Sequence, residues 1–220
     1  MQTIRIAGVE VPRIGLGTNR LTEENVDFVR AAVDAGLRHI DTAHLYTDGA
    51  SERTIGEAIG AREDVLVATK GGYRDGSPEA LRAEIEQSLE SLRTDVIGLY
   101  YLHRPGPDLE GSLATIKQYV DRGVIRAVGI SEVGVEEIER ARTVVPIAAV
   151  QNRYNRAERD HDDVVDHCER EGIVFVPYYP LHGDGTNAEK LTWLLERSPA
   201  IAPIPGTRSI EHLRENLALL

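Results

Sequence analysis

The stretch His39-Ile-Asp-Thr-Ala-His-Leu-Tyr46 reads as the end of a buried strand that leads into a loop with two proton-handling groups. The apolar run that begins at Leu37 stops at Asp41, and Tyr46 follows before a helix expected to start at Ser51. A carboxylate and a phenol are therefore held at the end of a strand. Active sites of α/β barrels lie at the carboxyl ends of the strands, so this stretch predicts both a fold and a site.

Two further strand-like runs end on a chemically useful side chain. Val65-Leu-Val-Ala-Thr-Lys70 finishes on a lysine, and Val96-Ile-Gly-Leu-Tyr-Tyr-Leu-His103 finishes on a histidine. If these strands are parallel neighbours, an aspartate, a tyrosine, a lysine and a histidine meet at one edge of the sheet. Each residue alone has an ordinary explanation, such as a turn cap, a solvated charge or core packing. The combination predicts a catalytic cluster.

Strand-like and helix-like segments alternate along the whole chain. Apolar runs recur at intervals of 23 to 31 residues and begin near Ile14, Leu37, Val65, Val96, Val124, Ile147, Ile173 and Ile201. Eight such units match a (β/α)8 TIM barrel. An open, doubly wound parallel sheet is the alternative, although no G-x-G-x-x-G turn follows a strand. Before the repeat, residues 3–12 predict a small N-terminal β-hairpin with Ala7-Gly8 at its turn.

Helix start signals separate the strand-like runs. Thr22 precedes a run in which Val26 and Val33 share one face, and Ser77-Pro78-Glu79 combines an N-cap serine with a first-turn proline. Later helices are expected near Leu109–Arg122, Val135–Arg142, Asp160–Arg170, Ala188–Glu196 and Ser209–Leu219. The order of these elements predicts a single barrel domain over residues 1–220, with shortened loops toward the C-terminus.

Composition narrows the class of protein. The 220-residue chain is 41% hydrophobic, has a formal net charge of −11 and contains one cysteine, Cys168. A negative charge disfavours nucleic acid and anionic membranes as partners, and a single cysteine suits a reducing compartment. No secretory leader or long apolar run is evident. These features predict a soluble, cytoplasmic protein with a small-molecule ligand, monomeric or weakly self-associating, and no metal site.

The four strand-end residues suggest how a carbonyl could be reduced. A phenol is a weak acid at neutral pH, but a nearby ammonium favours the phenolate and so eases proton donation by Tyr46. Lys70 supplies that charge, Asp41 holds Lys70 in place, and His103 hydrogen-bonds the substrate oxygen. No side chain delivers hydride, so the cluster implies a nicotinamide cofactor.

The chain also resembles the aldo-keto reductase family over nearly its whole length. The motifs that carry the resemblance are Asp41-Thr-Ala-His-Leu-Tyr46, Ala68-Thr-Lys70, Tyr101-Leu-His103-Arg-Pro, Val128-Gly-Ile-Ser131-Glu, Val150-Gln151-Asn, Val176-Pro-Tyr178-Tyr-Pro-Leu181 and Ile204-Pro-Gly-Thr-Arg208. The resemblance implies a catalytic tetrad of Asp41, Tyr46, Lys70 and His103, with Tyr46 as the acid–base group. It implies NADPH as the cofactor, in preference to NADH.

The resemblance assigns cofactor contacts position by position. Ser131 and Gln151 match residues that hold the nicotinamide carboxamide, and Tyr178 matches the aromatic residue that stacks on the nicotinamide ring. Thr18 and Asn19 would lie near the ribose and the reaction centre. The segment at the adenosine phosphate and adenine would comprise Gly206, Thr207, Arg208, His212, Glu215 and Asn216, and Glu132 and Leu181 complete the expected cofactor-binding set.

The sequence departs from the family pattern in three places. Many members have asparagine where Glu132 follows Ser131. Some place a cation where Gly206 and His212 stand, which leaves Arg208 as the main cation for a 2′-phosphate. The chain is also short after Leu181 and stops at Leu220. These short segments predict an open, permissive substrate pocket whose contacts come from rim residues Tyr73, Arg104 and Tyr154.

The leading interpretation is an NADPH-dependent reductase of aldehyde or ketone carbonyls. One alternative is a cofactor-binding regulatory or auxiliary protein on the same fold, which the intact tetrad disfavours. Another is a lyase or aldolase barrel that uses Lys70 as a Schiff base. That chemistry needs a neutral lysine, whereas Asp41 would keep Lys70 charged.

Overall fold

A parallel sheet curled into a barrel lies at the centre of the molecule, and the computed structural model describes residues 2–220. Each strand is hydrogen-bonded to the next one along the chain, in the order β3 (Leu16–Gly17), β4 (His39–Asp41), β5 (Leu66–Gly71), β6 (Leu99–Leu102), β7 (Val128–Ser131), β8 (Ile147–Gln151) and β9 (Val174–Phe175). The strand order is that of a (β/α)8 barrel, so the predicted fold class is confirmed.

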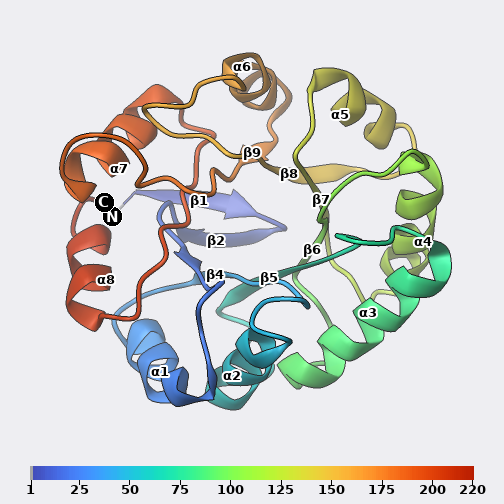
Figure 1. Cartoon of the computed structure of the whole chain (residues 1–220), viewed down its shortest axis with the longest axis horizontal. Coiled ribbons are helices and arrows are strands. Elements are labelled where there is room, and N and C mark those ends of the chain that lie inside the picture. The colour runs from blue at the N-terminus through green and yellow to red at the C-terminus, as the bar shows by residue number, and fades with distance from the viewer. Residues whose placement is uncertain (1) are drawn as a thin grey trace.

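Helices form a ring outside the strands, as Figure 1 shows. They are α1 (Val26–Asp34), α2 (Ala50–Ile59), α3 (Pro78–Leu92), α4 (Leu109–Asp121), α5 (Val135–Arg142), α6 (Asp162–Glu171), α7 (Asn187–Arg197) and α8 (Ile210–Leu217), with a short 3-10 turn η1 (Glu23–Asn25) before α1. The predicted start of α3 is observed: the Ser77 hydroxyl accepts a hydrogen bond from the Ala80 amide, and Pro78 begins the helix. None of the helices within residues 2–220 is both long and apolar enough to cross a membrane.

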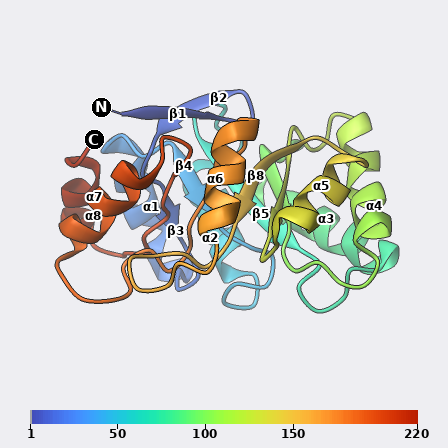
Figure 2. The same ribbon diagram turned by 90° about the horizontal axis from the view of Figure 1, so that it is seen from above.

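The predicted hairpin forms and covers one end of the barrel. Strands β1 (Thr3–Ile6) and β2 (Val9–Pro12) pair antiparallel, and Figure 2 shows them at the end away from the loops that follow the parallel strands. Ile6 and Val11 are buried against the barrel-interior side chains of Leu66 and Tyr101. The hairpin therefore closes the amino-terminal end of the barrel, and the carboxyl ends of the strands form its mouth.

The eighth strand expected from Ile201 is reduced to two isolated bridges. Ile201 pairs with Phe175 of β9, and Gly206 pairs with Gly17 of β3, so the segment still closes the barrel. The carbonyls of Pro203 and Pro205 accept hydrogen bonds from the Gly15 and Gly17 amides, at 2.9 and 3.2 Å. Proline has no N–H group that could donate a hydrogen bond back to the Gly15–Gly17 segment. These prolines therefore accept hydrogen bonds from that segment but donate none to it. The prediction of a regular eighth strand was therefore wrong, although the prediction that this segment closes the barrel was right.

Alternate residues of the strands face the barrel interior and the helices. Tyr100 belongs to the core between the sheet and the helices, whereas Tyr101 belongs to the interior core. Lys70 pairs in register with Tyr101 and so shares its inward direction, while Thr69 pairs with Tyr100. This alternation directs the Lys70 side chain into the barrel beneath its mouth.

Replacing Gly17 with alanine is expected to destabilise the barrel at its closure. A Cβ at Gly17 would lie 2.7 Å from the backbone oxygen of Ile204, which cannot move without disturbing the closing segment. Overpacking of this kind typically costs about 1–3 kcal/mol. Gly106→Ala is the matched control, because a Cβ there meets nothing within 4 Å. Urea unfolding measures both variants, and equal stabilities would contradict this account of the closure.

Candidate active site

The tetrad residues converge at the mouth of the barrel as predicted. Asp41 ends β4, Lys70 lies in β5, and His103 directly follows β6. The Lys70 ammonium lies 2.5 Å from Asp41 Oδ1 and donates to the Tyr46 hydroxyl oxygen at 3.3 Å. Lys70 and Asp41 are almost fully buried, with side chains 0% and 2% exposed. One cation thus links the carboxylate to the phenol.

Lys70 is held in its charged form. Burial opposes the charge, but the neighbouring Asp41 and the Tyr46 oxygen outweigh it, and the pKa of Lys70 is raised overall. The Thr42 carbonyl adds a third oxygen, which accepts from Lys70 Nζ at 2.7 Å. All three ammonium protons are therefore directed at oxygen atoms, and the sequence pattern had not indicated Thr42.

His103 is held in its neutral form. Burial, followed by the charges of Lys70, His44 and Arg104, lowers the pKa of His103 to about 3. Its ring meets the Tyr46 ring edge to face, with centroids 6.0 Å apart. A neutral imidazole can donate one N–H to a carbonyl oxygen without competing with Tyr46 as a charged acid. The predicted role of orienting the carbonyl fits this state.

Hydrogen bonds from other strands fix Asp41. Gln151 Nε2 donates to Asp41 Oδ2 at 2.8 Å, and the Thr18 hydroxyl donates to the Asp41 carbonyl at 2.8 Å. The Ser51 hydroxyl in turn donates to Thr18 Oγ1 at 2.9 Å and lies 2.8 Å from the Thr42 hydroxyl. Ser51 marked only a helix start in the sequence, and its contact with Thr18 joins residues too distant along the chain for local patterns to reveal.

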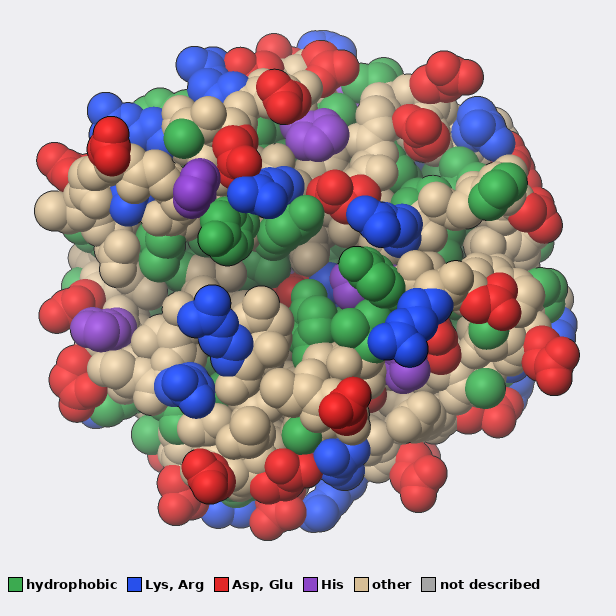
Figure 3. Space-filling view, viewed as in Figure 1, with side chains coloured by type: hydrophobic (Ala, Val, Ile, Leu, Met, Phe, Trp, Pro, Cys, Tyr) green, Lys and Arg blue, Asp and Glu red, His purple; other side chains and the backbone are tan. Residues whose placement is uncertain are grey.

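A cavity of about 460 Å³ extends from Asp41 and Tyr46 toward Arg208. Its walls contain seven of the predicted cofactor residues, namely Thr18, Asn19, Tyr178, Leu181, Gly206, Thr207 and Arg208, together with Arg20, Tyr179 and His182, which the sequence had not indicated. Figure 3 looks onto this end of the barrel and shows a hollow near its centre with Lys and Arg side chains around it. Asp41 and Tyr46 thus share one cavity with the predicted phosphate segment.

The other predicted cofactor residues do not line this cavity. Ser131 ends β7 and is buried. Glu132 has a φ of 59° and accepts a hydrogen bond from the Arg153 amide at 3.0 Å. Glu132 also acts on Tyr178, which does line the cavity: burial first, and then the Glu132 carboxylate, raise the pKa of Tyr178 to about 12. His212 and Glu215 are exposed on α8, whereas Asn216 is buried there. Cofactor contacts by these residues stay predictions.

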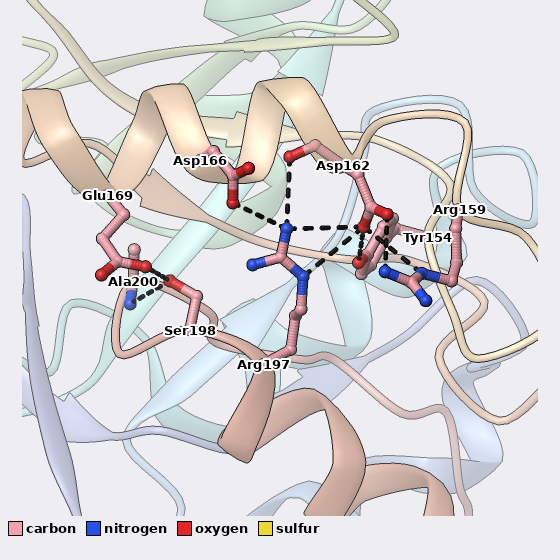
Figure 4. A network of polar contacts seen from close by, with 8 residues as sticks. All are labelled: Tyr154, Arg159, Asp162, Asp166, Glu169, Arg197, Ser198 and Ala200. Carbon is pink, nitrogen blue, oxygen red and sulfur yellow. Dashed lines mark hydrogen bonds and ion pairs between the residues drawn. The ribbon is translucent and has the colours of Figure 1, made fainter.

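The expectation that Tyr154 contacts substrate is wrong. Tyr154 is fully buried, where its ring packs against Phe175 and Trp193. Its hydroxyl donates to Asp162 Oδ1 at 2.5 Å, within a network that also includes Arg197 and is drawn in Figure 4. Tyr154 therefore helps to fix α6 and α7 to the barrel. Among residues 2–220, no group of three His, Cys, Asp or Glu side chains could hold a metal ion.

The fold and the site together define a (β/α)8 barrel with a buried cluster of ionisable side chains at the carboxyl ends of its strands. The sequence profile of the Aldo/keto reductase family matches residues 13–192. An uncharacterized oxidoreductase of Schizosaccharomyces pombe is 31% identical over 258 positions, covering 98% of this chain and 83% of that protein. Pyridoxine 4-dehydrogenase of Escherichia coli is 30% identical over 262 positions, covering 98% and 92%. The chain belongs to the aldo/keto reductase family.

Solved structures agree with this assignment. The thermostable aldo-keto reductase Tm1743, in complex with the inhibitor epalrestat, superposes with a TM-score of 0.90 at 29% identity, over 100% of this chain and 94% of that one. An aldo/keto reductase of Klebsiella pneumoniae, in complex with NADP and acetate, superposes with a TM-score of 0.88 at 30% identity, over 99% and 89%. The sequence alignments span more positions than the 220 residues of this chain, so those relatives carry internal segments that it lacks.

Proposed function

We propose that this protein reduces aldehyde or ketone carbonyls to alcohols with NADPH, and that Tyr46 is the general acid. The observation that carries the proposal is the buried ammonium of Lys70 between Asp41 and the Tyr46 hydroxyl, with neutral His103 beside the Tyr46 ring. Burying charged groups costs free energy that pairing only offsets, and clusters of buried ionisable groups with perturbed pKa values are typical of functional sites.

Each tetrad residue has a distinct task in this reaction. Tyr46 donates its hydroxyl proton to the carbonyl oxygen as negative charge develops there. Lys70 stabilises the phenolate that remains, and Asp41 holds Lys70 in position. His103 donates an N–H to the same carbonyl oxygen and orients it. NADPH, when bound, supplies the hydride that no side chain can provide.

The residues around the cavity fit a nicotinamide dinucleotide. Gly17 and Gly206 bring bare backbone to the cavity wall, which allows a phosphate to approach closely. The segment 206–208 leads into α8, whose cap Ser209 accepts from the His212 amide at 3.2 Å. Ser131 and Gln151 would hold the carboxamide, with Tyr178 against the nicotinamide ring. The NADP and NADPH complexes of the Klebsiella relatives support this placement.

Replacing Arg208 with alanine is expected to weaken NADPH binding while NADH binding barely changes. Arg208 lines the cavity and has no ion-pair partner within residues 2–220, so its guanidinium is available for a 2′-phosphate. A lost charge-assisted contact costs about 1.5–3 kcal/mol, or roughly one to two decades in Kd. Titration of cofactor fluorescence measures both affinities. Arg214→Ala, on α8 but outside the cavity lining, is the control.

Two outcomes would contradict this role of Arg208. Equal weakening of NADPH and NADH would show that Arg208 acts on a part common to both cofactors. A wild-type preference for NADH would show that the 2′-phosphate is not recognised at all.

A turnover panel tests the proposed function itself. Aldehydes, ketones and sugar-like carbonyls are offered with NADPH and NADH in parallel, and loss of reduced-nicotinamide absorbance is followed. Turnover with NADPH is expected, whereas cofactor binding without turnover would indicate an auxiliary protein. Borohydride trapping addresses a Schiff base at Lys70, which is disfavoured because its ammonium already donates to three oxygen atoms.

A further inference from the structure

Two tyrosines stand out on the surface of the barrel mouth. Tyr73, 42% exposed, and Tyr179, 52% exposed, are the exposed large hydrophobic side chains within residues 2–220. Each carries an arginine over its ring: the Arg104 guanidinium carbon lies 5.3 Å from the Tyr73 centroid, and that of Arg153 lies 4.7 Å from the Tyr179 centroid. Both pairs come from the loops that follow parallel strands, so they flank the catalytic mouth.

The two arginines differ in whether a carboxylate of the same chain pairs with them. Arg153 is neutralised by Glu158, whose carboxylate lies 2.9 Å from Arg153 Nε. Arg104 is exposed, and none of the ion pairs formed within residues 2–220 includes it. Two carboxylates lie near the Tyr73–Arg104 pair along the chain, Asp75 two positions after Tyr73 and Asp108 four positions after Arg104. Asp75 accepts hydrogen bonds from Ser77 and Asp108 accepts one from the Gly111 amide, and neither forms an ion pair with Arg104. Arg104 is therefore a positioned cation whose counter-charge the chain does not supply.

Arg104 is also connected to the reaction centre. The Tyr73 ring lies 4.9 Å from the imidazole of His103, between centroids, and the Arg104 guanidinium lies over that same Tyr73 ring. His103, Tyr73 and Arg104 thus form a column that runs from the carbonyl-orienting imidazole out to the rim. A substrate whose carbonyl oxygen is bonded to Tyr46 and His103 would extend along this column.

We propose that Arg104 is a specificity-determining residue that binds a carboxylate of the substrate, so that the preferred substrates are aldehydes with a carboxylate several atoms from the carbonyl. The inference rests on the proposed carbonyl reduction. A guanidinium presents a planar fork that matches a carboxylate, and the Tyr73 face holds that fork in place while contacting the hydrocarbon between the two groups. Because the chain carries a net charge of −11, an anionic substrate needs such a local cation.

The test compares two aldehydes that differ in charge, 4-formylbenzoate and its neutral methyl ester. The wild-type protein is expected to have the higher kcat/KM for 4-formylbenzoate. Arg104→Gln is expected to lower kcat/KM for 4-formylbenzoate by about tenfold, mainly through KM, since a partly exposed charge-assisted contact is lost. Turnover of the ester should change little. Rising ionic strength should narrow the wild-type preference.

Arg153→Gln is the matched control, because Arg153 also lies over an exposed tyrosine but is already paired with Glu158. It should leave the ratio of the two kcat/KM values unchanged. Equal losses of kcat/KM for the acid and the ester in Arg104→Gln would overturn the inference and assign Arg104 to the support of His103. No loss for either substrate in that variant would also overturn it. Turnover of neither aldehyde by the wild-type protein would instead count against the proposed function itself.

Discussion

Replacing Tyr46 with phenylalanine is expected to lower carbonyl turnover by about 10²–10⁴-fold while NADPH still binds. The variant removes the one hydroxyl that Lys70 contacts at the substrate end of the cluster, at 3.3 Å. It keeps the ring that meets His103 edge to face, so the shape of the site is retained. The predicted cofactor residues lie on β7, β8, α8 and loops other than the one that holds Tyr46, which separates binding from proton donation.

The measurement is single-turnover reduction of an aldehyde under conditions where the chemical step limits the rate. Cofactor affinity is measured in parallel by quenching of protein fluorescence. If Tyr46→Phe retained more than a tenth of the wild-type rate, another group would have to supply the proton. If NADPH binding were lost as well, Tyr46 would have a structural task that its contacts do not indicate.

Replacing Lys70 with methionine is expected to lower the free energy of unfolding by about 3–5 kcal/mol and to abolish most turnover. The reason is that Asp41 is only 2% exposed and would be left as a buried carboxylate without its cation. Gln151 Nε2 would still donate to the Asp41 carboxylate, but it carries no charge. Chemical denaturation and steady-state kinetics measure the two effects.

A double variant separates the charge from the packing of Lys70. Adding Asp41→Asn to Lys70→Met removes the unpaired carboxylate, so part of the lost stability should return while turnover stays low.

Since the pKa of Lys70 is raised, its charge stabilises the fold fully at any pH below the pKa of the unfolded chain, near about 10.4. That contribution is lost only as the pH rises through the higher pKa of the folded protein. The effect of Lys70→Met should therefore be similar at pH 7 and pH 9. Wild-type stability in the single variant would contradict the account.

The convergence of Asp41, Lys70 and His103 could be predicted because these residues lie at the ends of consecutive strands. Parallel pairing of β4 with β5 and of β5 with β6 brings Asp41, Lys70 and His103 together, and the alternation of strands and helices had favoured that pairing over a doubly wound sheet. The eighth strand could not be predicted in the same way. An apolar run at Ile201 resembles the others, but its hydrogen bonds are limited by the missing N–H groups of Pro203 and Pro205.

The other differences between the predicted and the observed site arise from the directions in which loop side chains point. Tyr154 follows a strand, as Tyr73 does, yet it turns inward to Phe175, Trp193 and Asp162, whereas Tyr73 turns out to the rim. No local sequence pattern distinguishes the two. The same holds for Arg104 and Arg153: only the folded chain shows that Glu158 neutralises one and that no carboxylate within residues 2–220 pairs with the other.

The most direct test of the central claim follows the hydrogen that reaches the carbonyl carbon. The protein is mixed with an aldehyde and NADPH that carries deuterium at both C4 positions of the nicotinamide, and the alcohol is analysed by mass spectrometry and NMR. The account predicts deuterium on the former carbonyl carbon, one equivalent for each cofactor oxidised, and a slower reaction with the same labelling in Tyr46→Phe. Cofactor that binds but is not oxidised, or an alcohol without deuterium on that carbon, would contradict it.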